Sequence, residues 1–560
     1  KKITHRESSE MSEIKAPEAK KQNGGKCDVD VISYQIGRSG ISDKSDKERA
    51  AAGPLEIDSE AAKYITKPNL KEKPVYRMEL ATWLSMRQFF LIRGWKEWNP
   101  KDGNTWNLYW RENRVGAFVI KNCFKCQRIN KFRDSNGITL KDLLALRMSD
   151  MREKHGSIFD FVPRTWVLPD QEEDLAAHVE KSSSNGKKLY ICKPARLSRG
   201  RNIFLFKKFK EMKTRIDEAS QYFSSLTKEQ KEVEHWVAQE YLYNPFLISG
   251  YKFDLRLYVL VTSLWPLQAF IYKRGLVRFA TSKYDLDASG DLFKHLTNSS
   301  INKDSESLHS EKGVVGKGCK WRLQKLMKYL KDECGRDTDL LWKQIKETVL
   351  LTLLPMVGTV PADPGTFEYF GFDVMLDENL RPYVIEVNSG PAMSVDMPQD
   401  KIVKVPMVDD MFNMLQLDKI NRHPREPFPQ YARRRSRTTK RAPRKEEKGT
   451  ADQEESNGDE GEVLGYQDLD IKQKGDWDII YGFSGCNSGD GDGQAREKGE
   501  GAAASQAETM GKKLARNYDT IKSSGTSMNK KQVSEKQLEE WASQVFVPFI
   551  GEVSGALEVW

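Results

Sequence analysis

Apolar and polar positions follow regular periods between residues 71 and 420, and these periods predict a folded body. Alternation with period two, or a short apolar run, predicts strands at 106–111, 189–192, 252–261, 270–272 and 382–388. Apolar residues at helical spacing predict helices at 321–330 and 340–354. Strands mixed with helices in this way indicate an α+β body of about 350 residues.

The segments that flank this body show no sustained apolar period. Residues 1–70 are rich in Lys, Glu, Ser and Gly, so we expect a disordered tail. Residues 421–450 form a basic segment. Residues 451–530 contain an acidic stretch and a Gly- and Ser-rich one, which predict a low-complexity linker.

The last segment, 531–560, carries a weak helix signal. A Ser-x-x-Gln capping box precedes apolar residues at helical spacing, namely Leu538, Trp541 and Val545. This pattern predicts either a short docking helix or a marginal helix that is exposed to solvent.

Composition narrows the class of protein. The chain has 560 residues, of which 38% are hydrophobic and 31% charged, enough for a large core plus polar extensions. The longest apolar candidate, 257–272, is interrupted by polar residues and Pro266, so we expect no membrane span. The first residues include neither an initiating Met nor a signal core, which leaves a fragment open and gives no sign of secretion. Seven cysteines fit a reducing, cytoplasmic compartment.

The positive charge is concentrated in one place. The whole chain carries +9, and residues 421–448 hold eleven Lys or Arg against three Glu, a local charge of +8. Such a run binds a polyanion, whether nucleic acid, anionic lipid or an acidic protein surface. A solvated tail or a nuclear-import signal is the alternative.

Two apolar runs, 370–376 and 382–388, flank a short polar turn and predict a β-hairpin. If the turn is centred between residues 379 and 380, Asp373 lies directly opposite Glu386, and Asn388 lies on the same face. Facing carboxylates repel each other, and a divalent cation relieves that repulsion. Oxygen ligands of these types suit Mg²⁺. The alternative is an exposed polar face in a shifted register.

A lysine and a basic, glycine-containing loop predict a phosphate-binding site. Lys193 ends the predicted strand 189–192, and Arg199, Gly200 and Arg201 follow in the next loop. Ammonium, guanidinium and backbone N–H groups all donate to nucleotide phosphates. The chain contains neither a P-loop motif nor a dinucleotide fingerprint, so a basic surface turn is the alternative.

Two further patterns are open to more than one interpretation. Alternation places Lys252, Asp254 and Arg256 on one face of a strand, where they bind a charged ligand or form a salt-bridge ladder. Cys123 and Cys126 have the spacing of half a zinc site, but no second pair follows at finger spacing, which favours ordinary thiols.

Taken in order along the chain, these segments resemble the tubulin-tyrosine ligase-like family, whose members are ATP-grasp amino-acid ligases. The likeness extends from about residue 77 to residue 412 and includes the motifs at 239–242, 252–256, 295–298 and 386–388. It is greatest to the tubulin polyglutamylases, and segments 191–195, 197–201, 298–303 and 318–321 are nearest to the type 2 members. The resemblance implies an ATP-grasp ligase body with disordered N- and C-terminal extensions.

The resemblance also implies a role for each matching position. ATP would be bound by Lys193, Arg199, Gly200, Arg201, Asn202, Ile203, Gln239, Glu240, Tyr241, Leu242, Lys252, Asp254, Thr297 and Asn298. Mg²⁺ would be bound by the hairpin residues Asp373, Glu386 and Asn388. The amino acid and the substrate carboxylate would meet Arg256, Arg278, Ser299, Ser300, Lys320 and Lys404. The catalytic set would be Lys193, Arg256, Asn298 and His295, the last with a structural role as its alternative.

Several positions depart from the family pattern. Asn202 stands where a second glycine is common, Ser299 where many members have Tyr, and Gly390 at a position that varies. Arg199 precedes Gly200 in place of Gln, which is similar to chain-initiating members.

The activity implied is ATP-dependent addition of glutamate, through an isopeptide bond, to glutamate side chains of the acidic tubulin tail. ATP and Mg²⁺ would be the cofactors, and free glutamate and tubulin or microtubules the partners, with no nucleic acid and no membrane. The basic segment lies where some glutamylases carry a microtubule-binding extension, so the location would be the cytoplasm and its microtubules, including cilia or flagella. The alternatives are a glycine or tyrosine ligase of the same fold, a small-molecule ATP-grasp ligase, and a catalytically weak microtubule-binding protein.

Overall fold

The structure is a computed structural model, and its described residues belong to one compact unit that begins at Leu55. It describes residues 57–68, 73–78, 84–112, 114–183, 188–197, 200–224, 235–264, 267–298, 302, 305, 307, 310–316, 318–357, 359–395, 397–418 and 474–481. The predicted N-terminal tail up to residue 56, the basic segment and the predicted helix in 531–560 lie outside this set. Within it, no helix has the length and apolar character that crossing a bilayer requires.

An N-terminal sheet opens the body. Its strands run parallel to their neighbours in the order β2-β1-β3-β4 and are β1 (Val75–Met78), β2 (Lys96–Glu97), β3 (Leu108–Trp110) and β4 (Arg128–Ile129). The nearby helices are α2 (Ser59–Ala62), α3 (Leu84–Ile92) and α4 (Ala117–Lys121). The strand predicted at 106–111 is confirmed as β3, whose three residues are all buried.

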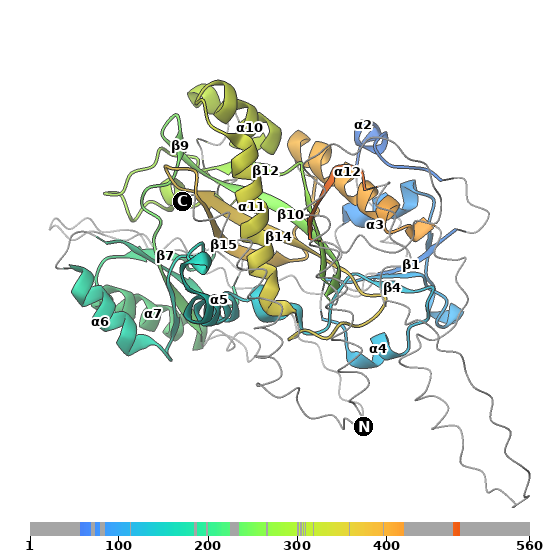
Figure 1. Ribbon diagram of the computed structural model, residues 1–560, viewed down its shortest axis with the longest axis horizontal. Coiled ribbons are helices and arrows are strands. Elements are labelled where there is room, and N and C mark those ends of the chain that lie inside the picture. Colours follow the sequence, from blue (N-terminus) through green and yellow to red (C-terminus); the bar gives the residue numbers. More distant parts are fainter. Residues whose placement is uncertain are drawn as a thin grey trace, which may run out of the picture. The chain divides into compact units, whose positions relative to one another are not determined.

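A second, smaller sheet is antiparallel, with the order β5-β8-β6-β7. Its strands are β5 (Thr165–Leu168), β6 (Tyr190–Pro194), β7 (Phe204–Phe206) and β8 (Trp236–Glu240). Helix α5 (Lys141–His155) precedes it, and α6 (Glu172–Ser183) and α7 (Phe209–Ser224) lie side by side against it (Figure 1). Trp166, Leu175, Tyr190 and Met212 join the sheet and these two helices in one core.

The central sheet has eight strands and is built around β10 (Tyr251–Leu264), which is long enough to pair with four others. Its other strands are β9 (Leu247–Ile248), β11 (Leu267–Tyr272), β12 (Leu276–Phe279), β13 (Lys320–Arg322), β14 (Glu368–Leu376), β15 (Pro382–Ser389) and β16 (Trp477–Tyr481). The four strands predicted at 189–192, 252–261, 270–272 and 382–388 are therefore confirmed as β6, β10, β11 and β15.

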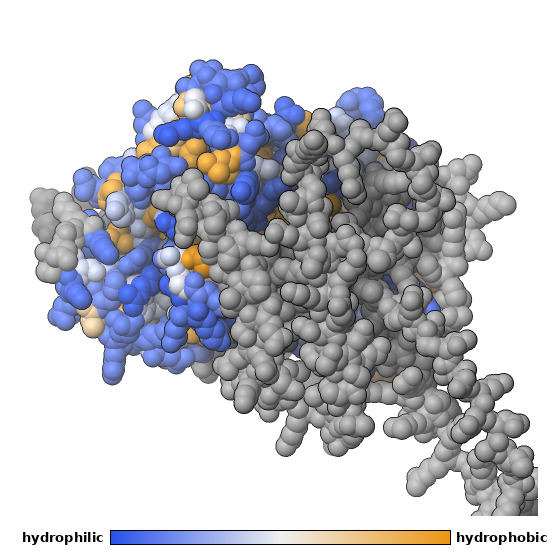
Figure 2. All heavy atoms as spheres, viewed as in Figure 1, coloured by the Kyte–Doolittle hydropathy of each residue, from blue (hydrophilic) through white to orange (hydrophobic). Residues whose placement is uncertain are grey.

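Apolar cores cover both faces of the central sheet. On one face, Phe253, Leu255 and Leu257 of β10 pack with α10 (Leu323–Asp332) and α11 (Thr338–Leu353), the helix that crosses this sheet in Figure 1. On the other, Tyr258 and Leu260 pack with α3 and α12 (Pro398–Met414). The short helix α8 (Leu292–His295) contacts β10 near its start. On the face seen in Figure 2, the described residues are mostly hydrophilic, as expected when the apolar residues fill cores.

Four predictions about elements need correction. Residues 57–68 were expected to belong to the disordered tail but include α2, because Ile57, Ala61 and Ile65 pack in an apolar core. Trp321 was expected in a helix but lies in β13, and α10 begins at Leu323, because β13 extends the central sheet next to β12. Residues 474–481, inside the predicted low-complexity linker, include β16, because Trp477 packs in the core. The hairpin pairing changes by one residue between Asp373 and Val374.

Candidate functional site

A cleft lies between the small sheet and the central sheet, and residues of both sheets line it. Lys193 and Gln239 reach it from the small sheet, and Lys252, Asp254 and Asp373 reach it from the central sheet. The sequence-predicted residues that line it are Lys193, Gly200, Arg201, Ile203, Gln239, Glu240, Tyr241, Leu242, Lys252, Asp254, His295, Thr297, Asn298, Asp373 and Glu386. Segments far apart in sequence therefore meet in one place.

The loop after Lys193 is shaped by two left-handed residues. Gly200 has φ +73° and Asn202 has φ +56°. Asparagine tolerates this conformation better than most residues that have a side chain, so Asn202 can occupy a position where glycine is common. Arg199 lies outside the described residues.

Lys193 is buried at the edge of the cleft, where its ammonium donates a 2.8 Å hydrogen bond to Oε1 of Gln239. Burial lowers the pKa of Lys193 to about 8, although the nearby Glu386 favours the charged form. An ammonium whose positive charge is only partly balanced by carboxylates of the protein is suited to bind an anionic ligand.

A hydrogen-bonded chain connects Lys252 to His295. The ammonium of Lys252 donates to the hydroxyl of Tyr241 at 2.7 Å, and that hydroxyl lies 2.9 Å from Nδ1 of His295. Nε2 of His295 lies 3.1 Å from the carbonyl oxygen of Ala288. Both ring nitrogens therefore have partners within the protein, and burial lowers the pKa of His295. This arrangement favours the structural role that the sequence left open for His295.

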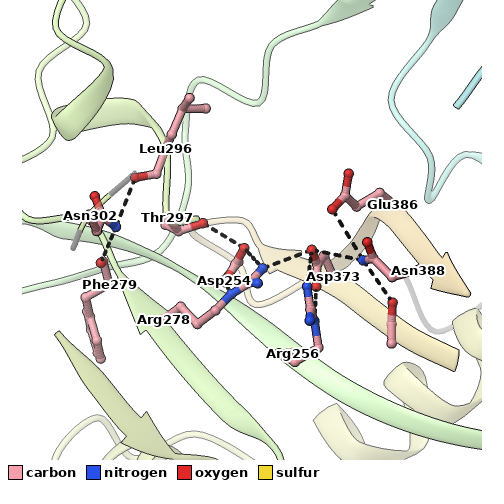
Figure 3. A network of polar contacts seen from close by, with 11 residues as sticks. Asp254, Arg256, Arg278, Phe279, Leu296, Thr297, Asn302, Asp373, Glu386 and Asn388 are labelled. Atoms are coloured by element: carbon pink, nitrogen blue, oxygen red, sulfur yellow. Dashed lines mark hydrogen bonds and ion pairs between the residues drawn. The ribbon is translucent and has the colours of Figure 1, made fainter. Parts of the chain in front are cut away.

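The hairpin places the three oxygen-bearing side chains together. Asp373 pairs directly with Glu386, as the sequence predicted. The amide nitrogen of Asn388 lies 3.4 Å from Oδ2 of Asp373 and 3.3 Å from Oε1 of Glu386 (Figure 3). Burial, and then the charge of Asp373, raise the pKa of Glu386. The negative charge of Glu386 is therefore only partly balanced by the positive charges near it.

Asp373 is held by two guanidinium groups. Arg256 donates to it from Nε at 2.5 Å and from Nη2 at 3.0 Å, and Nη2 of Arg278 lies 3.0 Å from its Oδ2 (Figure 3). Burial opposes the charged form, but these two arginines hold the pKa of Asp373 well below its usual range. Arg278 also donates to both carboxylate oxygens of Asp254, which accepts from Thr297 Oγ1 at 2.7 Å. Asp254 and Arg256, which lie on one face of β10, thus belong to a network of ion pairs at the site.

A second group of charges continues this network away from the cleft. Lys320 donates to both oxygens of Asp400, at 3.1 and 2.9 Å, and the Lys404 ammonium lies 3.1 Å from the same carboxylate. Lys404 also donates to the carbonyl oxygen of Ser394 at 2.6 Å. The predicted substrate residues Arg256, Arg278, Lys320 and Lys404 therefore form ion pairs with Asp254, Asp373 and Asp400, and none of the four lines the cleft. Ser299 and Ser300 lie outside the described residues.

Some residues at the site were not predicted from the sequence. Lys141 lines the cleft, and its ammonium lies 3.8 Å from Oε2 of Glu386. Asp400 anchors two of the predicted lysines, and its spacing of four residues from Lys404 on one helix was the available signal. Tyr258, two residues after Arg256 on the same face of β10, has a buried hydroxyl with no hydrogen-bond partner in the described part of the chain. No sequence signal marked Lys141 or Tyr258.

The predicted thiols are buried. Cys123 and Cys126 form no disulfide, and among the described residues no group of three His, Cys, Asp or Glu side chains could hold a metal.

The sequence of the chain is similar to those of known proteins. Residues 120–423, more than half of the chain, match the profile described as the tubulin-tyrosine ligase family. The probable tubulin polyglutamylase TTLL2 of Homo sapiens is 37% identical over 358 residues, which cover 63% of this chain and 57% of that protein. The tubulin polyglutamylase TTLL6 of Mus musculus is 33% identical over 371 residues, or 64% of this chain and 42% of that protein.

A third relative, the tubulin polyglutamylase TTLL5 of Homo sapiens, is 34% identical over 343 residues, which cover 59% of this chain and 25% of that protein. The chain therefore spans less than two thirds of the length of each of these relatives.

Proposed function

Because this chain belongs to the tubulin-tyrosine ligase family, we propose that it is an ATP-dependent ligase that adds glutamate to glutamate side chains of the tubulin tail. The family and the α+β fold class predicted from the sequence are confirmed. The relatives named tubulin polyglutamylases support glutamate as the amino acid and tubulin as the acceptor. The single observation that carries the proposal is the cleft where two buried lysines face the Asp373–Glu386 pair.

The cleft supports ATP as the first substrate. Lys193 and Lys252 supply ammonium groups for phosphates, and the Gly200 turn brings backbone N–H groups near them. Segment 239–242 and the apolar side chains of Ile191 and Met375 would receive the adenine.

The donor set of the hairpin fits Mg²⁺. Asp373 and Glu386 supply carboxylate oxygens at one place, and Asn388, whose amide nitrogen lies between the two carboxylates, would turn its amide oxygen toward a bound ion. When bound there, Mg²⁺ would neutralise charge on the phosphate oxygens. Arg256 and Arg278 would keep Asp373 ionised, and so ready to act as a ligand.

The charge network supports a dicarboxylic amino acid. Arg256, Arg278, Lys320 and Lys404 bring four cationic groups to one region, and the unpartnered hydroxyl of Tyr258 lies on the same face of β10. Glutamate offers a second carboxylate for such a pocket, whereas glycine and tyrosine do not. This is the reason to prefer glutamate over the other amino acids of the family.

The reaction follows from the low reactivity of a carboxylate. A tubulin side-chain oxygen attacks the γ-phosphorus of ATP, the bond to the β-phosphate oxygen breaks, and ADP leaves. The amine of free glutamate then attacks the acyl phosphate, phosphate leaves, and the amine loses a proton to form the isopeptide. The side chains of this protein position the reactants and balance charge, and none has to become covalently attached.

The basic segment would bind the polyanionic partner. Its local charge of +8 is complementary to an acidic tubulin tail. The location that would follow from this proposal is the microtubule cytoskeleton, including that of cilia or flagella. The direct test combines the purified protein with ATP, Mg²⁺, microtubules and radiolabelled glutamate, glycine or tyrosine. Incorporation from glutamate alone is expected. Label from glycine or tyrosine would redirect the proposal, and pelleting without label would favour a binding protein.

A further inference from the structure

Strand β16 lies outside the part of the chain that matches the family profile. The profile match ends at residue 423, and 62 residues, 415–476, separate α12 from β16; 55 of them, 419–473, lie outside the described residues. Nevertheless β16 pairs antiparallel with β11, with Phe270 opposite Ile479 and Tyr272 opposite Trp477. A short segment distant in sequence thus completes one edge of the central sheet.

The edge that β16 covers is apolar. With β16 in place, all six residues of β11 are buried, and without β16 the outer side of β11 would be an unpaired sheet edge. The Trp477 side chain has no exposed surface, its ring centroid lies 5.0 Å from that of Tyr272, and its Nε1 lies 3.3 Å from the carbonyl oxygen of Met407 in α12. Ile479 and Ile480 pack against the cores on opposite faces of the sheet.

Polar contacts fix the position of the segment along the groove. Asp478 accepts from Trp342 Nε1 at 3.0 Å and from the Lys346 ammonium at 3.2 Å, both on α11. The backbone N–H of Asp476 donates to Oδ2 of Asp410 at 3.1 Å, and the same oxygen accepts from the Tyr272 hydroxyl at 2.9 Å.

The turn that leads into β16 favours glycine at residue 475. Gly475 has φ +56°, and a Cβ there would lie 2.1 Å from the Asp410 carboxylate. The contacts of Trp477, Asp478 and Gly475 are each specific to the residue type, which distinguishes this segment from a chance contact of a polar linker.

We propose that residues 474–481 are a separable docking strand, and that β11, α11 and α12 form a peptide groove for it. The occupant is this chain's own Gly-Asp-Trp-Asp-Ile-Ile segment, bound by addition of a strand to the sheet edge. The cost of closing a loop grows slowly with its length, so a connection of 62 residues permits pairing within one chain. In the sequence, the basic segment then lies between two described parts of the body, the one that ends at residue 418 and the one that begins at residue 474. This inference does not depend on the proposed enzymatic function.

The test uses the full chain with a site for a sequence-specific protease inserted after Gly465. After cleavage, the fragment that carries β16 is expected to coelute with the body in size-exclusion chromatography. The Trp477→Ala variant is expected to release the fragment. Trp541→Ala is the matched control, since it removes a tryptophan from the same fragment and is expected to leave it bound.

Release of the parent fragment, retention by Trp477→Ala, or release by Trp541→Ala would overturn the proposal. If Trp477→Ala aggregates before cleavage, Asp478→Asn provides a milder change. It should raise at least tenfold the rate at which a labelled peptide of residues 472–483 replaces the cleaved fragment, and an unchanged rate would overturn the proposal. Light scattering of the uncleaved chain should give one 64.3 kDa copy. A dimer that Trp477→Ala converts to monomer would show instead that the groove takes the strand of a second copy.

Discussion

Asp373 and Glu386 lie directly opposite each other across the β14–β15 hairpin because β15 carries one extra residue at this point. Val384 and Val387 are three residues apart, yet both are buried in the same core, while Ile385 and Glu386 between them both line the cleft. This is a β-bulge, which re-aims side chains next to a site. With strict alternation from Val384 onward, Glu386 would point into the core. The bulge keeps it beside Asp373.

Removing the charge of Glu386 should therefore stop catalysis without affecting microtubule binding. In Glu386→Gln, the amide keeps the size and one oxygen of the side chain but loses the negative charge that a divalent cation requires. We expect incorporation of labelled glutamate to fall at least 100-fold, with unchanged pelleting on microtubules.

Glu378→Gln is the matched control for this variant. Glu378 is an exposed residue in the turn of the same hairpin, where its carboxylate accepts from Asn244 at 2.9 Å. The control should incorporate glutamate at the parent rate. Parent-like incorporation by Glu386→Gln would mean that the assignment of the metal ligands is wrong.

The limits of sequence reasoning are clearest at this hairpin and at β16. Alternation and an assumed turn between residues 379 and 380 predicted the Asp373–Glu386 pair, but the strands leave the turn one residue out of that register, and the bulge restores the pairing at Asp373. The bulge at Ile385 could not be predicted, since it depends on which valines the core accepts. Trp477 lies in a polar region of the sequence with no pattern that predicts burial. It is buried because β11 and α12, which are distant in sequence, provide its contacts. Asp400 was missed because a buried carboxylate between two lysines depends on tertiary contacts.

Tyr258→Phe should separate a role in amino-acid binding from a role in packing. The hydroxyl of Tyr258 is buried and has no partner in the described residues, and the charges that act on it most are those of Arg256 and Asp400. If it donates to bound glutamate, the KM for glutamate should rise about five- to tenfold, the effect of losing one hydrogen bond. The KM for ATP should not change, and thermal stability should stay the same or increase.

Tyr190→Phe provides the comparison. Its hydroxyl is also buried and unpartnered among the described residues, but it lies in the core of the small sheet. It should change neither KM. An unchanged KM for glutamate in Tyr258→Phe would place that hydroxyl outside the amino-acid pocket.

Replacing Arg433, Arg434 and Arg435 with Gln should weaken microtubule pelleting. These residues contribute three of the eleven positive charges in 421–448, and exposed charges act over longer distances when little salt is present. The loss of affinity should therefore be largest at low salt. A control triple variant at Lys512, Lys513 and Arg516 removes the same charge outside the basic segment. Equal pelleting of the two triple variants at low salt would contradict the role of the basic segment.

Binding of ATP should take up a proton above neutral pH, because Lys252 is poorly charged in the free protein. Its ammonium donates to Tyr241 and lies 4.4 Å from the centroid of that ring and 5.8 Å from that of Tyr284. Burial lowers the pKa of Lys252 to about 7. The charge of Asp254 opposes this decrease, and the charge of Lys193 adds to it. His295, the other titratable group of this chain of hydrogen bonds, has a lowered pKa and is neutral in this range.

The sign of the effect follows from these values. Above pH 7 the free protein holds Lys252 increasingly in its neutral form, whereas phosphate oxygens favour the ammonium. Affinity for ATP should therefore fall as pH rises from 7 to 9, by up to about tenfold per pH unit for each coupled proton, and Lys193, whose pKa is about 8, contributes a second proton in the upper part of this range. Calorimetry at pH 8 in two buffers of different ionisation enthalpy should show net proton uptake, and Lys252→Met should reduce it. Constant affinity between pH 7 and 9 with no proton uptake would remove Lys252 from the phosphate site.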